Sequence, residues 1–307
     1  MTPKQLARLA IVLGALLLLW GGASLARRGS RGPSESDRFA IPPVARDSVD
    51  SVIIMRPADT TRLVRQGSAA WMVNGHPAAQ SAIQELFSAL ADTARRTELV
   101  AGRSASHSAL GVDSAKGGKV RIVRGDSTVA DLVQGNRGPS LDGGYFRAAG
   151  DSAVYLVGGN LAQVLERSED EWRDRRIAGV APDSVGRIEV SRAKRSYSVR
   201  RDGARWVLES GPADSAAIAA LLADYRQVEA AGFATKAQAD SAKFGRPDRR
   251  AALLRADGTP LVTLAFDSTA NGFWVKAGED STVYRIDTWF ADRLAPADST
   301  LRAKVSS

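Results

Sequence analysis

The sequence contains no cysteine and only two histidines, His76 and His107. The lack of cysteine excludes disulfide bonds, thiolate zinc sites, a cysteine nucleophile and a lipid-modified cysteine. Neither histidine has another histidine or a carboxylate at ligand spacing, and zinc needs at least three protein ligands. We therefore expect both histidines to be surface turn residues. We predict no catalytic, cofactor-binding or metal-binding residue.

Several motifs with a known chemistry are also missing. A phosphate-binding loop requires G-x-x-x-x-G-K-[ST], but Gly117-Gly118-Lys119 is followed by valine and lacks this spacing. The glycine-rich stretch 135–144 joins two predicted strands, which favours a hairpin loop. No calcium-loop spacing occurs, so the recurring Asp-Ser dipeptides predict turns and helix N-caps. No G-x-S-x-G elbow is present, although composition alone does not exclude a Ser-His-Asp triad.

Much of the positive charge lies close to the N-terminus. The formal net charge is +8, and without the five basic residues that precede Pro33 it is +3. No acidic residue precedes Pro33; the five basic residues are Lys4, Arg8, Arg27, Arg28 and Arg31. Charge in this position favours contact with a membrane over a nucleic-acid groove. We expect no nucleic-acid partner.

The stretch from Leu9 to Ala26 is apolar and carries no charge. Its length is near the lower limit of the roughly 20 residues that cross a bilayer. Two interpretations compete: an uncleaved transmembrane anchor, and a signal peptide cleaved after Ser24-Leu25-Ala26. The long apolar core and Arg27-Arg28 directly after that position favour the anchor. Basic residues flank both ends, so charge does not decide the orientation.

The soluble region carries an internal repeat. The stretch 144–157, GYFRAAGDSAVYLV, is echoed at 272–286 by GFWVKAGEDSTVYRI, and both predict a β-hairpin. Trp206 follows Trp71 by 135 positions. The same spacing relates two apolar helix stripes, Ile83, Leu86, Phe87 and Leu90 in one and Ile218, Leu221, Leu222 and Tyr225 in the other. We infer that a gene duplication produced two units.

These patterns predict an α+β protein, in which an N-terminal transmembrane helix precedes two tandem repeats, each an antiparallel sheet with packed helices. The predicted order is a short tail over 1–8, the anchor over 9–26, a flexible Ser-, Gly- and Pro-rich tether over 27–47, one unit over 48–180, a second over 182–295, and a tail over 296–307.

Aromatic residues on the predicted strands allow two interpretations. They belong to the core, because strand alternation buries one face, or they line a groove for a sugar or peptide. The adjacent pair Phe273-Trp274 must place one ring on each face of its strand. The other residues in question are Trp71, Tyr145, Phe146 and Trp206.

The order of these features resembles the bacterial domain of unknown function 4340 family. It is carried by Asp214-Ser215 before a helix, by Phe244-Gly245-Arg246-Pro247, and by the two G-[YF]-[FW]…VY hairpins. It covers about 48–295 together with the apolar segment; Ala79-Gln80 and Leu110 depart from the pattern in the first unit. The resemblance implies an exported envelope protein without known catalytic residues. Such proteins are often encoded beside auxiliary and permease subunits of ABC-type transporters that resemble gliding-motility export systems.

We therefore expect a non-enzymatic, membrane-anchored envelope accessory protein, with the bilayer as partner through Leu9 to Ala26 and with other envelope or ABC-transporter proteins as further partners. The expected location is the bacterial inner membrane, with the soluble region on the periplasmic or extracytoplasmic side. No cofactor and no metal are expected. The alternative is an envelope ligand-binding protein or enzyme that acts on glycans or peptides through an aromatic-lined cleft.

Overall fold

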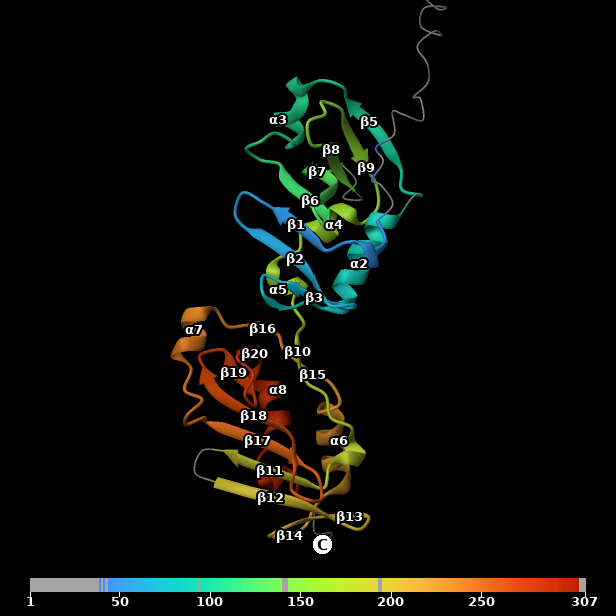
Figure 1. Ribbon diagram of the computed structural model, residues 1–307. Coiled ribbons are helices and arrows are strands. Elements are labelled where there is room, and N and C mark those ends of the chain that lie inside the picture. The colour runs from blue at the N-terminus through green and yellow to red at the C-terminus, as the bar shows by residue number, and fades with distance from the viewer. Residues whose placement is uncertain are drawn as a thin grey trace, which may run out of the picture. The chain divides into compact units, whose positions relative to one another are not determined.

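The computed structural model describes Phe39, Ile41 and residues 44–92, 94–139, 143–192 and 195–303 (Figure 1). The chain forms two compact units: the first ends at Arg167, and the second starts at Ser168 and also takes in Gly75–Gln80. The described residues form two nine-stranded sheets with the same strand order, β4-β3-β2-β1-β6-β7-β8-β9-β5 and β14-β13-β12-β11-β17-β18-β19-β20-β16.

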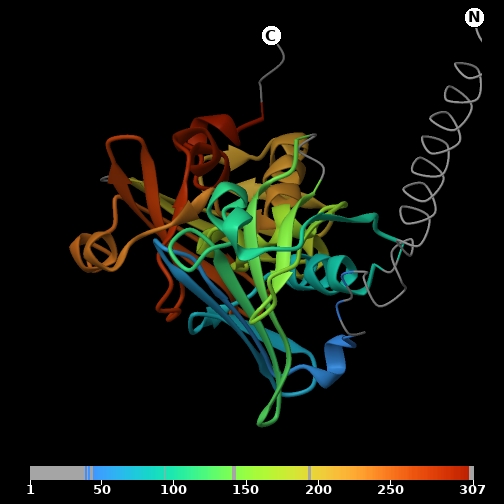
Figure 2. The same cartoon turned by 90° about the horizontal axis from the view of Figure 1, so that it is seen from above.

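The first sheet follows from alternation of apolar and polar residues. In β1 (Ser51–Met55), Val52 and Ile54 are buried and their neighbours are half-buried, as expected for a sheet with one covered face. Figure 2 shows the hairpin of β6 and β7 alongside β1 and β2. The strands after β1 are β2 (Thr60–Gln66), β3 (Ala70–Val73), β4 (His76–Pro77), β5 (Thr97–Ala101), β6 (Gly118–Arg124), β7 (Ser127–Arg137), β8 (Gly144–Ala148) and β9 (Val154–Val157).

Helix α2 (Gln80–Ala91) buries the predicted stripe of the first unit, which confirms that helix. Within this stripe the ring of Phe87 packs at 5.3 Å from the ring of Trp71. The other helical segments of this unit are short: η2 (Arg46–Ser48), η3 (Ser104–Ser106), α3 (His107–Leu110) and α4 (Leu161–Leu165).

The second sheet repeats the alternation. In β11 (Arg187–Arg192), Ile188 and Val190 are buried, whereas Arg187 and Glu189 are exposed. The other strands of this sheet are β12 (Arg195–Asp202), β13 (Arg205–Leu208), β14 (Gly211–Pro212), β16 (Gly232–Phe233), β17 (Arg249–Leu254), β18 (Pro260–Thr269), β19 (Gly272–Ala277) and β20 (Tyr284–Ile286). A separate two-stranded sheet joins β10 (Arg176–Ala178) and β15 (Val228–Glu229).

One face of the second sheet is covered by α6 (Ser215–Asp224) and α8 (Thr288–Leu294), whose apolar residues share one core with the buried strand residues. Helix α6 begins after Asp214, whose carboxylate accepts the N–H groups of Ala216 and Ala217. Such a cap satisfies donors that have no partner within the helix. The remaining helical segments of this unit are α5 (Glu169–Trp172), α7 (Lys236–Ser241), η4 (Pro182–Ser184) and η5 (Asp298–Thr300).

The predicted fold class is wrong. The described residues are mainly antiparallel sheet, and their longest helix, α2, has 12 residues. Strands outweigh helices because each of the two large sheets has nine strands, with short strands such as β5, β14 and β16 at the edges. The structure is therefore two large sheets with short helices, in place of a transmembrane helix followed by helix-packed repeats.

The predicted inner-membrane location also needs correction. Within residues 44–303, apart from the gaps given above, no helix is both long enough and apolar enough to span a bilayer. The predicted anchor at Leu9 to Ala26, the tail before it and nearly all of the predicted tether lie outside the described residues. Nothing in the part of the chain that the structure describes supports a single-pass inner-membrane anchor.

Candidate functional site

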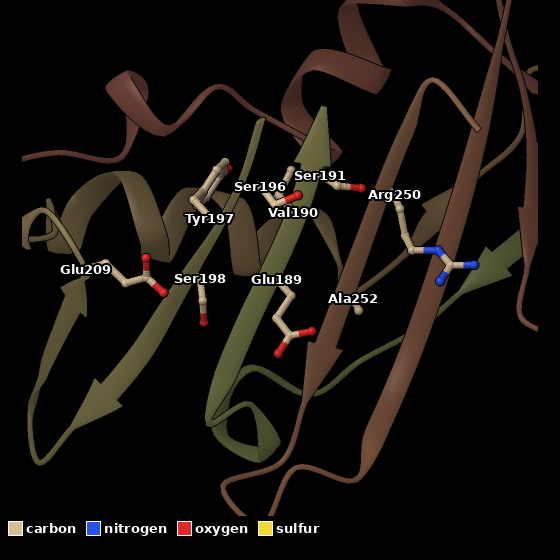
Figure 3. A pocket seen from close by; sticks show the side chains of 9 residues that line it. All are labelled: Glu189, Val190, Ser191, Ser196, Tyr197, Ser198, Glu209, Arg250 and Ala252. Atoms are coloured by element: carbon tan, nitrogen blue, oxygen red, sulfur yellow. The ribbon is translucent and has the colours of Figure 1, made fainter. Parts of the chain in front are cut away.

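A hollow of about 300 Å³ lies on the second sheet, over β11, β12 and β17 (Figure 3). Both its position and its shape follow from the strand register. Glu189 lies opposite Ser198 on one side and Ala252 on the other, and Ser191 lies opposite Ser196 and Arg250. The lining residues are Glu189, Val190, Ser191, Ser196, Tyr197, Ser198, Glu209, Arg250 and Ala252.

Strand alternation explains why the hollow is polar. Val190 is buried in the core, so its neighbours Glu189 and Ser191 project from the opposite face of β11. Short serine and alanine side chains at adjacent cross-strand positions leave a depression in this face. Longer side chains stand at its rim.

Acidic groups flank the centre of the hollow. Figure 3 shows Glu209 and Glu189 on either side of Ser198. Both glutamates are exposed, and Glu189 lies 3.5 Å from the Arg187 guanidinium. Arg250 stands at the opposite end of the lining and is exposed. Carboxylates accept hydrogen bonds and attract cations, so this surface suits a donor or cationic side chain.

The first sheet carries different residues at the same register positions. There Ile53 lies opposite Arg62 and Arg121, where the second sheet has Glu189 opposite Ser198 and Ala252. The guanidinium of Arg121 also pairs with Asp131 at 2.8 Å. Two long side chains therefore occupy positions that the second sheet leaves to serine and alanine. The hollow is a feature of the second unit's sequence, and the shared strand order does not require it.

Serine hydroxyl groups line the hollow, but none of its described lining residues is a histidine or lysine that could accept a proton from them. Its nine described lining residues include three serines and no histidine or lysine. Tyr197 projects toward the covered side, where its hydroxyl donates to the carbonyl oxygen of Pro296 at 2.7 Å. Burial raises the pKa of this phenol well above its ordinary value. Tyr197 therefore stays protonated and acts in structure.

The aromatic residues singled out in the sequence do not gather in one cleft. Trp71, Phe146 and Phe273 are buried in the cores. Trp274, next to Phe273, is half-buried on the other face of β19, as alternation predicted. Tyr145 packs against the small cluster of Val112, Val133 and Val154. Trp206 is 9% exposed and lines a different hollow, described below.

Neither histidine lines this hollow. His107 begins α3 and its Nε2 is 3.0 Å from the Ser152 carbonyl oxygen, while His76 begins β4. Both are half-buried. Among the described residues no group of three or more His, Cys, Asp or Glu side chains is arranged to hold a metal ion.

The Asp-Ser dipeptides act as predicted where contacts show their role. Asp113 accepts the N–H groups of Ala115 and Lys116, and Asp151 and Asp280 each accept an N–H two residues ahead. Asp214 caps α6, as described above. These aspartates stabilise turns and a helix end, which confirms the structural interpretation of the motif.

The family comparison covers the junction of the two units. Residues 71–212, from Trp71 in β3 to Pro212 in β14, match the family model described as Domain of unknown function (DUF4340). This match confirms the family resemblance over residues 71–212. No curated protein and no solved structure matches the chain. The DUF4340 match includes β11, β12 and Glu209, but it ends before β17, so Arg250 and Ala252 lie beyond it.

Proposed function

We propose that this protein is a non-enzymatic accessory protein that binds a protein partner through the open face of its second sheet. The observation that supports the proposal is the hollow over β11, β12 and β17, which is lined by serine and alanine side chains together with Glu189, Glu209 and Arg250. A face of this kind admits a protruding side chain of a partner and surrounds it with polar groups.

The size and lining of the hollow favour a protein over a small ligand. Its volume of about 300 Å³ is at the lower end of ligand pockets, and such pockets are mostly apolar and aromatic. Here serine, glutamate and arginine predominate, and Tyr197 is bonded to Pro296 on the covered side. A lysine or arginine of a partner that entered between Glu189 and Glu209 would satisfy both carboxylates.

The partner class comes from the family resemblance. The resemblance leads us to expect that members of this family are encoded beside auxiliary and permease subunits of ABC-type export systems. We propose such a subunit as the partner.

The test fills the hollow with residues that the first sheet already carries at the same register positions. The double variant Ser198→Arg, Ala252→Arg introduces the counterparts of Arg62 and Arg121, which a sheet of the same strand order accommodates. We expect its co-purification with the neighbouring transporter subunits to fall at least about tenfold, a loss of ~1.4 kcal/mol in binding free energy.

Ser127→Arg is the matched control, because Ser127 is exposed at the start of β7 in the first unit. The control should bind as the wild type does, and all variants should keep the wild-type circular dichroism spectrum. Equal binding by the double variant and the wild type would refute the proposed surface.

A further inference from the structure

A second charged surface lies where β11 and β12 meet η4 in the second unit. Two hollows of about 400 Å³ and 270 Å³ adjoin there and share Asp183 and Arg201. Arg187 and Arg200 line the larger one, and Arg226 lines the smaller one. We call this surface the arginine cleft; its basic residues are Arg187, Arg200, Arg201 and Arg226.

The arrangement of these guanidinium groups is unfavourable without a counter-charge. Arg187 lies directly opposite Arg200 in the sheet register, and like charges at such positions destabilise a strand pair. All four arginines are exposed. Among the described residues that line the two hollows, Asp183 is the acidic one, and Glu189 outside them lies 3.5 Å from Arg187. The surface therefore carries an excess of positive charge.

The first unit shows that the fold does not need these charges. The N–H of Arg65 donates to the Asp50 carbonyl oxygen at 2.8 Å, and the N–H of Arg201 donates to Gly186 O at the same distance. This shared contact sets the correspondence between the two sheets. At the positions of Arg187 and Arg200, which lie opposite each other, the first sheet has Ser51 opposite Val64.

The arginine that both units keep pairs with a carboxylate of the preceding strand segment in the first unit. There the Arg65 guanidinium pairs with the Asp50 carboxylate at 2.6 Å and donates to Val49 O at 2.9 Å. The second unit has Gly186 in place of Asp50, so Arg201 has no carboxylate from that position. A side chain at Gly186 would overlap the backbone of Ala256, which explains the glycine.

The smaller hollow likewise arises from a change of side chain. In the first unit Phe87 fills the space beside Trp71, with the two rings 5.3 Å apart. The corresponding residue of α6 is Leu222, which is shorter and lines the hollow next to Trp206. The Arg201 guanidinium lies 6.0 Å from the centre of the Trp206 ring. The floor is thus apolar and the rim is basic.

We propose that the arginine cleft binds an acidic, extended segment of a protein partner. Guanidinium groups recognise carboxylates through paired, charge-assisted hydrogen bonds. A segment that occupied both hollows would pass Arg201, which lines both. Its carboxylates would meet the Arg187–Arg200 pair in the larger hollow and Arg226 in the smaller one. An apolar side chain of the segment would lie beside Trp206. The inference deepens the proposed protein-binding function, on which it rests, by adding a second contact with a defined partner chemistry.

The test measures binding of the full-length protein to a fluorescein-labelled decapeptide of alternating glutamate and glycine, by fluorescence anisotropy at about 150 mM salt. The triple variant Arg187→Ser, Arg200→Val, Arg226→Ala introduces the residues of the first unit, including Ala91 at the position of Arg226. Exposed ion pairs are individually weak, so removing three cations should weaken binding by about tenfold.

The matched control, Arg62→Ser, Arg96→Ser, Arg103→Ser, removes the same charge from exposed positions of the first unit. It should change affinity less than about twofold, and a lysine–glycine decapeptide should not bind the wild type. Equal weakening in both triple variants would overturn the cleft as the site. Tighter binding of a single-stranded oligonucleotide, or displacement of the peptide by equimolar inorganic phosphate, would overturn its assignment to an acidic protein segment.

This experiment contains no transporter subunit. Failure of the co-purification test above would leave a localised peptide site standing, with another acidic protein as its partner. Loss of peptide binding with intact co-purification would refute the cleft alone.

Discussion

The hydroxyl of Tyr225 is a buried anchor between the helix ends of the second unit, and its removal gives the sharpest stability test. It donates to the carbonyl oxygen of Leu294 at 2.8 Å, and the side chain is fully buried. Tyr225→Phe leaves that carbonyl without this donor. The expected loss in the free energy of unfolding is about 1–3 kcal/mol. For a unit of this size the melting temperature should fall by about 3–9 °C.

The pH dependence gives a second test, of the burial of the Tyr225 phenol. Burial raises the pKa of Tyr225 above the ordinary value of about 10. Above about pH 10 the unfolded chain loses this proton while the folded chain keeps it, so the phenol's contribution to stability declines as the pH rises. The deficit of Tyr225→Phe should therefore shrink above that pH, by at most about 1.4 kcal/mol per pH unit.

Urea titration of the full-length chain, followed by tryptophan fluorescence at about pH 8, 10 and 11, measures both effects. Tyr197→Phe is the matched control: its hydroxyl bonds Pro296 at 2.7 Å from a half-buried position, and its loss should cost less than about 1 kcal/mol. Wild-type stability of Tyr225→Phe at about pH 8, or a deficit that is constant up to about pH 11, would refute the reasoning.

Three further predictions concern single positions. Gly272→Ala should lower stability by more than about 1 kcal/mol in thermal melts, because φ is +145° and an added Cβ would overlap Ile286 O, whereas Gly203→Ala, with open space around it, should cost less. Asp214→Ala should cost about 1 kcal/mol through loss of the α6 cap, with Asp214→Asn near wild type. The pKa of Asp50 is lowered by the Gly125 N–H and by Arg65, so the free energy of unfolding should fall at acidic pH as this carboxylate is protonated. In urea titrations, Asp50→Asn should show a smaller fall in stability at acidic pH than the wild type.

Local patterns were sufficient for the elements of the internal repeat. The stripe at Ile83, Leu86 and Phe87 predicted α2, and the structure buries all three residues. The hairpins at 144–157 and 272–286 were also predicted, and β8 with β9 and β19 with β20 pair as expected. These elements depend on the period of apolar residues along the chain, which neighbouring residues carry by themselves.

The missed strands lack that local signal. Strand β5 (Thr97–Ala101) lies at the edge of the first sheet, and its Leu99 and Val100 are 49% and 42% exposed. Its pairing with β9 also contains an irregularity between Leu99 and Ala101. An edge strand of this kind has no buried face to impose alternation, so only its hydrogen-bonded neighbour identifies it as a strand.

The candidate sites could be predicted even less. The nearest signal was a set of serines and an alanine at alternate strand positions, such as Ser191, Ser198 and Ala252, where the first unit carries longer residues. Reading that signal requires the cross-strand register, which the sequence does not state. The arginine cleft depended on the same information, because Arg187 and Arg200 become neighbours only through the pairing register of β11 and β12.

Taken alone, the sequence established the family resemblance, the absence of cysteine chemistry and the elements whose apolar period is local. The tertiary structure decided the sheet-dominated fold, the open polar face of the second sheet and the charge that gathers at its end. The physical reason is that strand neighbours are chosen by hydrogen bonds and packing between distant segments, and those contacts determine which side chains meet.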